Sequence, residues 1–294
     1  MLALLTVRVV VALITFFVAG IGAVAYFLVH GKPPEPVAPA VVETPRVVGA
    51  VHTVVGTSVE GRSIETFSYG NGSTQLLFVG GIHGGYEWNS SVLAYAAMDY
   101  FAAHPETIPQ NVTVTIIPAM SPDGTYKVVG KEGRFDALDV PPSPDQSPGR
   151  FNAHGVDLNR NFDCKWQPNG TWKNNTVSAG TAPFSEPEAA ALRDLIFKIR
   201  PAAVVLWHSK ANAVYASQCE NGILPKTLDI MNAYAKGSGY PAVKEFTAYP
   251  TTGAAEDWLA AIGIPAISVE LSTHETVEWE KNLGGMTALI NLFR

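Results

Sequence analysis

The sequence predicts an α/β domain with a mixed, mostly parallel sheet flanked by helices. Continuous apolar segments, such as residues 75–82 and 202–208, are typical of strands that are buried on both faces of a sheet. Segments whose apolar residues recur with helical spacing, such as 90–104, alternate with such strands along the chain. The chain has 294 residues, of which 47% are hydrophobic and 16% charged, so it can bury a sizeable core. These observations indicate one large folded domain.

The expected elements begin with an antiparallel pair of strands at residues 47–55 and 63–69. The strands that follow are expected at 75–82, 112–120, 202–208 and 266–271. The helices between them are expected at 90–104, 185–199, 224–239 and 279–293. Ser185 and Glu188 have the spacing of a capping box, which predicts that the second of these helices begins there.

The N-terminal residues differ from the rest of the chain. Residues 9–29 carry no charge and are numerous enough to span the hydrocarbon core of a bilayer. We therefore expect residues 1–30 to form a transmembrane anchor. A cleaved signal peptide is the alternative, because the stretch AGIGAVA within the segment offers small residues for cleavage. The proline-rich residues 31–46 are expected to form an extended linker, and residues 47–294 the folded domain. Either reading of the N-terminus places that domain outside the cytoplasm, in the periplasm or the extracellular space.

Charge and cysteine content narrow the possible partners and compartments. The formal net charge of −6 leaves no basic footprint for nucleic acid, so nucleic acid is excluded as an expected partner. The two cysteines, Cys164 and Cys219, are compatible with an oxidising compartment. The residues alone leave both a disulfide and two free buried thiols open.

Polar side chains follow the ends of several expected strands. His83 and His208 come directly after apolar segments, Glu270 lies at the end of another, and Asp123 follows a fourth. Ligand sites of α/β sheets lie at the carboxyl ends of the strands, so we expect these side chains at one edge of the sheet.

Three of these polar residues form a metal-ligand set. His83, Glu87 and His208 match the His₂Glu combination that catalytic zinc sites use with an open position for water. Zinc lowers the pKa of its bound water, and Glu270 is a candidate for the base that accepts the proton. The structural alternative is that Glu87 only favours the start of a helix and that Glu270 is a hydrogen-bonded polar residue. His154 and His274 are candidates for supporting positions around the ligands.

Seven short motifs occur in one order along the chain. They are IHGGYEW, SPDG, GRFNAHGVDLNRNF, PFSEPE, LWHS, Tyr249 followed by AEDW, and SVEL. With these motifs the chain resembles zinc carboxypeptidases of the M14 type across residues 50–294. The resemblance implies an eight-stranded mixed sheet and one zinc ion per chain.

The resemblance also implies catalytic roles. His83, Glu87 and His208 match the zinc ligands, and Glu270 matches the general base. Arg150 matches the arginine that stabilises the developing oxyanion. The first motif has one residue more between histidine and glutamate than the family pattern, and we expect the paired glycines before Tyr86 to accommodate it. The motif SPDG replaces the usual NPDG, a mild change in a supporting turn.

Substrate binding is implied by further matches. Asn159 and Arg160 match the pair that binds the terminal carboxylate of the substrate, and Tyr249 matches the tyrosine that closes over it. Glu256 matches the residue at the floor of the side-chain pocket, where an acid accompanies basic substrates. Glu220 is a possible second acid near the rim. The alternative is that Glu256 lies in the first turn of a helix and faces water.

The leading functional hypothesis is a membrane-anchored, extracytoplasmic zinc metallocarboxypeptidase. We expect a monomer that acts on peptides, with a preference for basic or amine-bearing C-terminal residues. The alternatives are a cell-wall peptidase acting on muropeptides that contain diaminopimelate, a zinc amidohydrolase of N-acyl amino acids, and a binding module without catalysis. Because Cys164 and Cys219 each follow an active-site motif, we further predict a disulfide that joins two loops at the rim.

Overall fold

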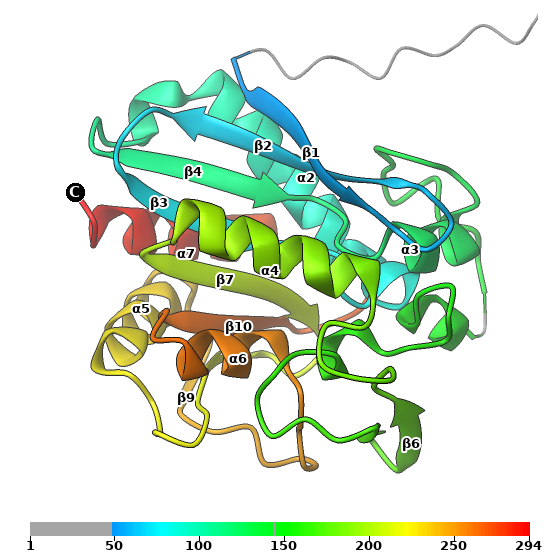
Figure 1. Ribbon diagram of the computed structural model, residues 1–294. Helices are drawn as coiled ribbons and strands as arrows, with labels where there is room; N and C mark the ends of the chain where they lie inside the picture. The colour runs from blue at the N-terminus through cyan, green and yellow to red at the C-terminus, as the bar shows by residue number, and fades with distance from the viewer. Residues whose placement is uncertain (1–48, 144) are drawn as a thin grey trace, which may run out of the picture. The chain divides into compact units, whose positions relative to one another are not determined.

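An eight-stranded mixed sheet forms the centre of the computed structural model, which describes residues 49–143 and 145–294 (Figure 1). The strands lie in the order β1-β2-β4-β3-β7-β10-β8-β9. Their bounds are β1 Val51–Thr57, β2 Ser63–Gly70, β3 Thr74–Val79, β4 Val112–Ile117, β7 Ala203–Ser209, β8 Ala213–Ala216, β9 Ala242–Val243 and β10 Ala266–Leu271. The strands β5, Asn169–Trp172, and β6, Asn175–Ser178, form a separate antiparallel hairpin.

The four central strands β4, β3, β7 and β10 are parallel to one another. The strands β1 and β2 extend one edge in antiparallel pairing, and β8 pairs antiparallel with β10 at the other edge. Every residue of β4 and β7 is buried, and residues 203–207 of β7 are all apolar, as expected of a strand that is covered on both faces. In β4 the buried residues include Thr113 and Thr115.

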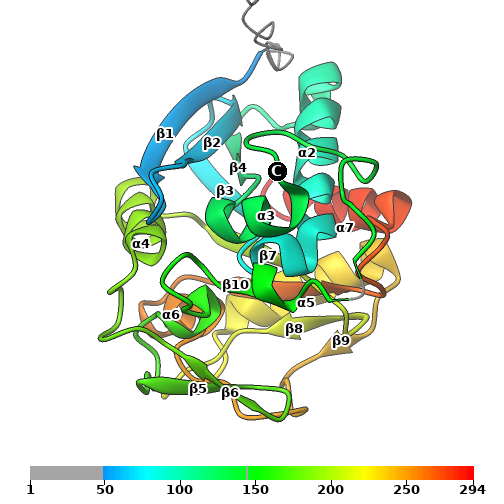
Figure 2. The ribbon, with the colours of Figure 1, turned by 90° about the vertical axis from the view of Figure 1, so that its right-hand side faces the viewer.

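Helices cover both faces of the sheet (Figures 1 and 2). Their bounds are α2 Trp88–Ala103, α3 Pro122–Val129, α4 Pro187–Ile199, α5 Pro225–Ser238, α6 Ala255–Ala261 and α7 Trp279–Asn291. Side chains alternate between two apolar clusters, so Phe78 packs with α2, α5 and α7 on one face while Leu77 packs with α4 and α6 on the other. The sheet is thus held rigidly between two helical layers.

The predicted fold class is confirmed: the domain is α/β, with a large, mostly parallel mixed sheet flanked by helices. All the expected strands and helices are present with small shifts at their ends. The helix α3, the short strands β8 and β9 and the β5–β6 hairpin were not expected.

The predicted capping box at the start of α4 is wrong. The helix begins at Pro187 with Glu186 at its N-cap, and no side chain caps it. Glu188 is fully buried, and its carboxylate accepts hydrogen bonds from the Asn152 side chain, at 3.3 Å, and the Val59 backbone, at 3.3 Å. These tertiary partners replace the local bond that the capping box requires.

The predicted anchor at residues 1–30 and linker at 31–46 lie outside the described residues, so both remain predictions. Among the residues that the structure describes, no helix has the length and apolar character needed to cross a bilayer.

Candidate active site

The candidate site lies at the carboxyl ends of three neighbouring parallel strands, an edge that faces the viewer in Figure 2. His83 follows β3, His208 is the penultimate residue of β7, and Glu270 lies near the end of β10. The register pairs Glu270 with His208. Because all three strands run in the same direction, their ends deliver these side chains to one edge of the sheet.

The turn after β3 brings the second carboxylate to this edge. It forms a short 3₁₀ helix, Gly84–Glu87, and α2 begins directly after it. Gly84 has a φ of +46°, and a Cβ atom there would lie 2.5 Å from the carbonyl oxygen of Gly149. A Cβ atom on Gly85 would lie 2.4 Å from Val128. Only glycine fits these two positions, and the tight turn they form contains the one additional residue of the first motif.

His83, Glu87 and His208 form a compact group of potential metal ligands. All three are buried, and their ligand atoms lie within 4.8 Å of one another. Nδ1 of His83 and Nε2 of His208 are buried without a hydrogen-bond partner. Nitrogen atoms that are buried and unsatisfied in this way are costly unless a ligand such as a metal ion binds them.

The electrostatics of the group also suit a cation. Burial and the Arg150 guanidinium lower the pKa of His83 well below its usual range, so its imidazole is neutral, as a metal ligand must be. Burial lowers the pKa of His208, but the hydrogen bond and charge of Glu87, 3.2 Å from Nδ1, raise it to about 9. With this pKa the His208 imidazole holds a second proton and a positive charge at neutral pH. A bound metal ion would supply the positive charge beside Glu87 in place of that second proton. The residues present therefore fit a zinc ion.

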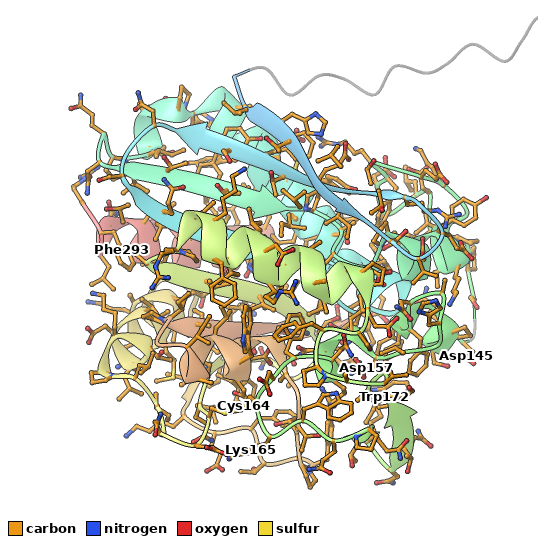
Figure 3. The ribbon with its side chains drawn as sticks, viewed as in Figure 1. Asp145, Asp157, Cys164, Lys165, Trp172 and Phe293 are labelled. Atoms are coloured by element: carbon orange, nitrogen blue, oxygen red, sulfur yellow. A yellow bond between two sulfur atoms is a disulfide. The ribbon has the colours of Figure 1, made fainter. Side chains whose placement is uncertain are left out.

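Arg150 is fixed beside this group by a residue that the sequence analysis missed. The carboxylate of Asp157 accepts a hydrogen bond from Nε of Arg150, at 2.9 Å, and lies 2.8 Å from its terminal nitrogen. Asp157 and Trp172 are labelled in Figure 3. The other carboxylate oxygen of Asp157 lies 3.4 Å from Nδ1 of His83, without making a hydrogen bond to it. The ring of Trp172 stacks on the guanidinium at 4.7 Å. The only local signal for Asp157 was its place before a short 3₁₀ turn, where its carboxylate accepts a hydrogen bond from the backbone N–H of Asn159.

The residues matched to carboxylate binding lie in the same cavity as the metal ligands. Arg160 donates to the carbonyl oxygens of Asn159, at 2.6 Å, and Thr171, at 2.8 Å, which hold its guanidinium in place. Burial raises the pKa of Tyr249, which keeps its hydroxyl protonated and able to donate. Together these side chains can bind an anion.

Glu270 has the properties of a proton acceptor near neutral pH. Its carboxylate accepts a hydrogen bond of 3.1 Å from the backbone N–H of Ala211. Burial and the negative charge of Glu87 raise the pKa of Glu270 to about 7, although the charge of His208 acts in the opposite direction. A pKa in this range suits a group that first accepts and then returns a proton.

Two acids at the start of α6 also line the cavity. Glu256 accepts hydrogen bonds from Ser268, at 3.0 Å, and Asn159, at 3.4 Å, while its Oε2 atom is buried without a partner. Asp257 accepts from the backbone N–H of Gln218 at 3.0 Å. Burial and the neighbouring Glu256 raise the pKa of Asp257 to about 7. Glu256 therefore lines the cavity rather than facing bulk water.

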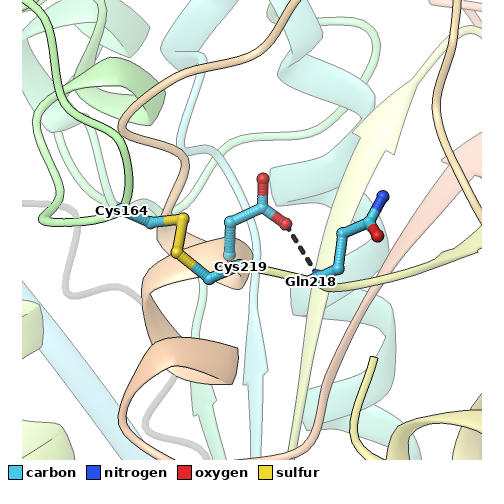
Figure 4. The surroundings of a disulfide bond; sticks show 4 residues. Cys164, Gln218 and Cys219 are labelled. Carbon is cyan, nitrogen blue, oxygen red and sulfur yellow. Dashed lines mark hydrogen bonds between the residues drawn. A yellow bond between two sulfur atoms is a disulfide. The ribbon is translucent and has the colours of Figure 1, made fainter. Parts of the chain in front are cut away.

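Cys164 and Cys219 form a disulfide with an S–S distance of 2.06 Å (Figure 4). The bond connects the loop after Arg160 to the segment after β8. Gln218, which binds Asp257, directly precedes Cys219. The disulfide thus ties the loop that carries Arg160 to the segment that supports the acidic end of the cavity.

The whole cavity has a volume of about 300 Å³. It is lined by the predicted residues His83, Glu87, Arg150, Asn159, Arg160, His208, Tyr249, Glu256 and Glu270. Its further lining residues include Tyr86, Trp172, Lys173, Lys210, Asp257 and His274. Of these, only His274 was a candidate from sequence; its ring nitrogen lies 2.7 Å from the Ser209 hydroxyl.

Three sequence candidates lie outside the cavity lining. Asp123 is buried in contact with Ser58 and Arg62, where it supports the turn after β1. His154 pairs with Glu186 at 2.7 Å. Glu220 is exposed and does not line the cavity, so the second acid of this site is Asp257.

Comparison with known families identifies the class. The zinc carboxypeptidase model, Peptidase_M14, matches residues 43–283. The chain belongs to this family: it is a metallopeptidase and a hydrolase. The predicted resemblance is confirmed, and the family is zinc-dependent.

Individual relatives have different activities. The chain is 26% identical over 243 residues to gamma-D-glutamyl-L-diamino acid endopeptidase 1 of Lysinibacillus sphaericus, covering 75% of this chain and 60% of that protein. It is 26% identical over 244 residues to carboxypeptidase B of Helicoverpa zea, covering 74% and 55%. The chain thus spans little more than half the length of these curated relatives.

Solved structures share the fold. A murein-tripeptide amidase from Escherichia coli O157 matches with a TM-score of 0.60 at 24% identity, covering 85% of this chain and 96% of that one. Carboxypeptidase A from Helicoverpa armigera matches with a TM-score of 0.62 at 20% identity, covering 82% and 69%. At these identities the likeness establishes the fold alone.

Proposed function

We propose that the protein is a zinc-dependent carboxypeptidase that releases C-terminal residues whose side chains carry an amine or guanidinium group. The observation that carries the proposal is the partnerless Oε2 atom of Glu256, buried in the same cavity as Arg160 and Glu270. A buried carboxylate oxygen without a hydrogen bond is costly, and a cationic substrate side chain would supply the missing partner.

The metal would be held by His83, Glu87 and His208. When bound, zinc supplies Lewis-acid polarisation of the scissile carbonyl and a water of lowered pKa. Glu270 accepts the proton of the attacking water and returns it to the leaving amine. The guanidinium of Arg150, held by Asp157, is placed to stabilise negative charge that develops on the carbonyl oxygen.

The leaving residue would be recognised at two points. Arg160, Asn159 and Tyr249 bind its free carboxylate, and a bidentate guanidinium suits that group better than an ammonium would. Glu256 and Asp257 surround its cationic end. This division requires a substrate with a carboxylate and a positive charge on the same C-terminal residue, as in lysine, arginine or diaminopimelate.

A second candidate function is hydrolysis of a cell-wall peptide. The observation that favours it is the 75% coverage of this chain by an endopeptidase whose name specifies a γ-D-glutamyl bond to a diamino acid. The leaving residue is the same in both proposals, and only the acyl part of the substrate differs. A predicted anchor at residues 1–30 would hold the domain outside the cytoplasm, where such peptides occur; the anchor and the monomeric state remain predictions from the sequence.

The experiment compares kcat/KM for acylated substrates that end in Arg, Lys and Phe, on the wild type and on Glu256→Gln. An ion pair in a partly desolvated pocket contributes about 1.5–3 kcal/mol, so we expect Arg and Lys to exceed Phe by about 10–150-fold. Glu256→Gln should remove most of this preference, whereas Glu220→Gln, which changes an exposed acid outside the cavity, should preserve it. A wild type that prefers Phe would refute the proposal. A γ-glutamyl-diaminopimelate substrate in the same assay separates the two candidate functions.

A further inference from the structure

Two lysines at the mouth of the cavity have no role in the reaction described above. Lys173 lies in the turn between β5 and β6, and Lys210 directly follows β7. Both are exposed, and both line the cavity. Among residues 49–143 and 145–294, neither lysine lies within 4 Å of a carboxylate oxygen. By contrast, Arg150 contacts the carboxylates of Glu87 and Asp157, and His208 contacts Glu87. The two lysines are therefore available to a ligand.

Lys173 is held in position by an aromatic wall. Its ammonium group donates a hydrogen bond of 3.0 Å to the hydroxyl of Tyr86 and lies 5.1 Å from the ring of Trp172. The Tyr86 ring itself packs between Trp172, at 5.1 Å, and His274, at 4.7 Å. Because these contacts restrict the lysine side chain, binding an anion there costs less conformational entropy than at a free surface lysine.

The position of the lysines relates them to one part of the substrate. Lys173 binds Tyr86, which directly precedes the ligand Glu87, and Lys210 follows the ligand His208 by two residues, so both lysines lie near the metal group. The acids Glu256 and Asp257 belong instead to α6 and are assigned above to the leaving residue. Arg160 is assigned to the terminal carboxylate of the substrate and Arg150 to the oxyanion. The acyl part of the substrate is therefore the part that can contact the two lysines.

We propose that Lys173 and Lys210 bind a carboxylate on the substrate residue that precedes the scissile bond. This inference rests on the proposed function, and it names the chemistry of the acyl residue. That carboxylate could be the side chain of an α-linked glutamate or aspartate, or the free α-carboxylate of a γ-linked glutamyl residue. The site would then accept an anion at its mouth and a cation at its inner end.

The experiment uses N-acetylated dipeptides that all end in lysine. Their acyl residues are α-linked Glu, α-linked Gln, γ-linked Glu, and γ-linked Glu whose α-carboxylate is an amide. At low salt we expect kcat/KM for at least one acid to exceed that of its own amide by about 3–10-fold, because each partly exposed ion pair contributes modestly. The preference should decrease as salt is added, since exposed charges are screened. Comparison of the two acids identifies which source of the carboxylate the site prefers.

Variants test which residues are responsible. The double variant Lys173→Gln/Lys210→Gln should reduce kcat/KM for the preferred acid at least threefold more than for its amide. The matched control is Lys236→Gln on α5, an exposed lysine outside the cavity, which should leave the acid-to-amide ratio unchanged. A wild type without a preference for either acid, or a double variant that retains it, would overturn the inference. If lysine is released from all four substrates equally, the proposed carboxypeptidase function stands and only this inference fails.

Discussion

Removal of the disulfide should destabilise the domain by several kcal/mol. The perturbation is the double substitution Cys164→Ala/Cys219→Ala, which avoids placing hydroxyl groups at two buried positions. The bond joins residues that are 55 positions apart, so it restricts the unfolded chain strongly. In the chain-entropy model a loop of this length corresponds to about 4 kcal/mol at 25 °C. We therefore expect the free energy of unfolding to decrease by about 3–4 kcal/mol.

The assay is equilibrium urea denaturation, followed by tryptophan fluorescence, with and without reductant. The reduced wild type should unfold at the same urea concentration as the alanine variant, and the variant should not respond to reductant. The slope of the transition should increase in the variant and in the reduced wild type, because the unfolded chain without the cross-link is less compact and exposes more surface. A variant within 1 kcal/mol of the oxidised wild type would refute the reasoning. So would two alkylatable thiols in the folded, non-reduced protein.

Three further predictions concern the active site. His208→Ala should lower the zinc content from about one ion per chain to near zero, measured by elemental analysis of the purified protein; full occupancy would exclude His208 as a ligand. Glu270→Gln should retain zinc but lose about 10²–10⁴-fold in kcat, because only the proton acceptor is removed; near-normal turnover would exclude this role. Arg160→Ala should raise KM for peptides with a free C-terminus, whereas C-terminally amidated peptides should be poor substrates of both forms. An equal effect on both kinds of peptide would show that Arg160 does not bind the carboxylate.

The sequence by itself determined the fold class and the place of the site. Strands such as β3 and β7 are buried on both faces, so the continuous apolar segments 76–79 and 203–207 mark them without any knowledge of their neighbours. Parallel strands end at one edge of the sheet, which is why His83, His208 and Glu270 could be assigned to one site before their contacts were known.

Only the tertiary structure decided which polar groups meet. Asp157 binds Arg150, and Lys173 binds Tyr86, across loops whose relative path has no periodic signature in the sequence. The same reason explains the wrong capping box, because Glu188 is bound by a side chain 36 residues away.

The acidic residues also show that the sequence identifies candidates and the tertiary structure decides among them. Glu256 and Glu220 were both plausible pocket acids in the sequence, yet Glu256 lines the cavity while Glu220 is exposed. Asp123 follows a strand like the true site residues, but Ser58 and Arg62 bind it away from the cavity. Burial is encoded locally because it depends on each residue's own side chain and on the period of its helix or strand. The pairing of charges depends on where distant loops pack, and that is decided only when the chain is folded.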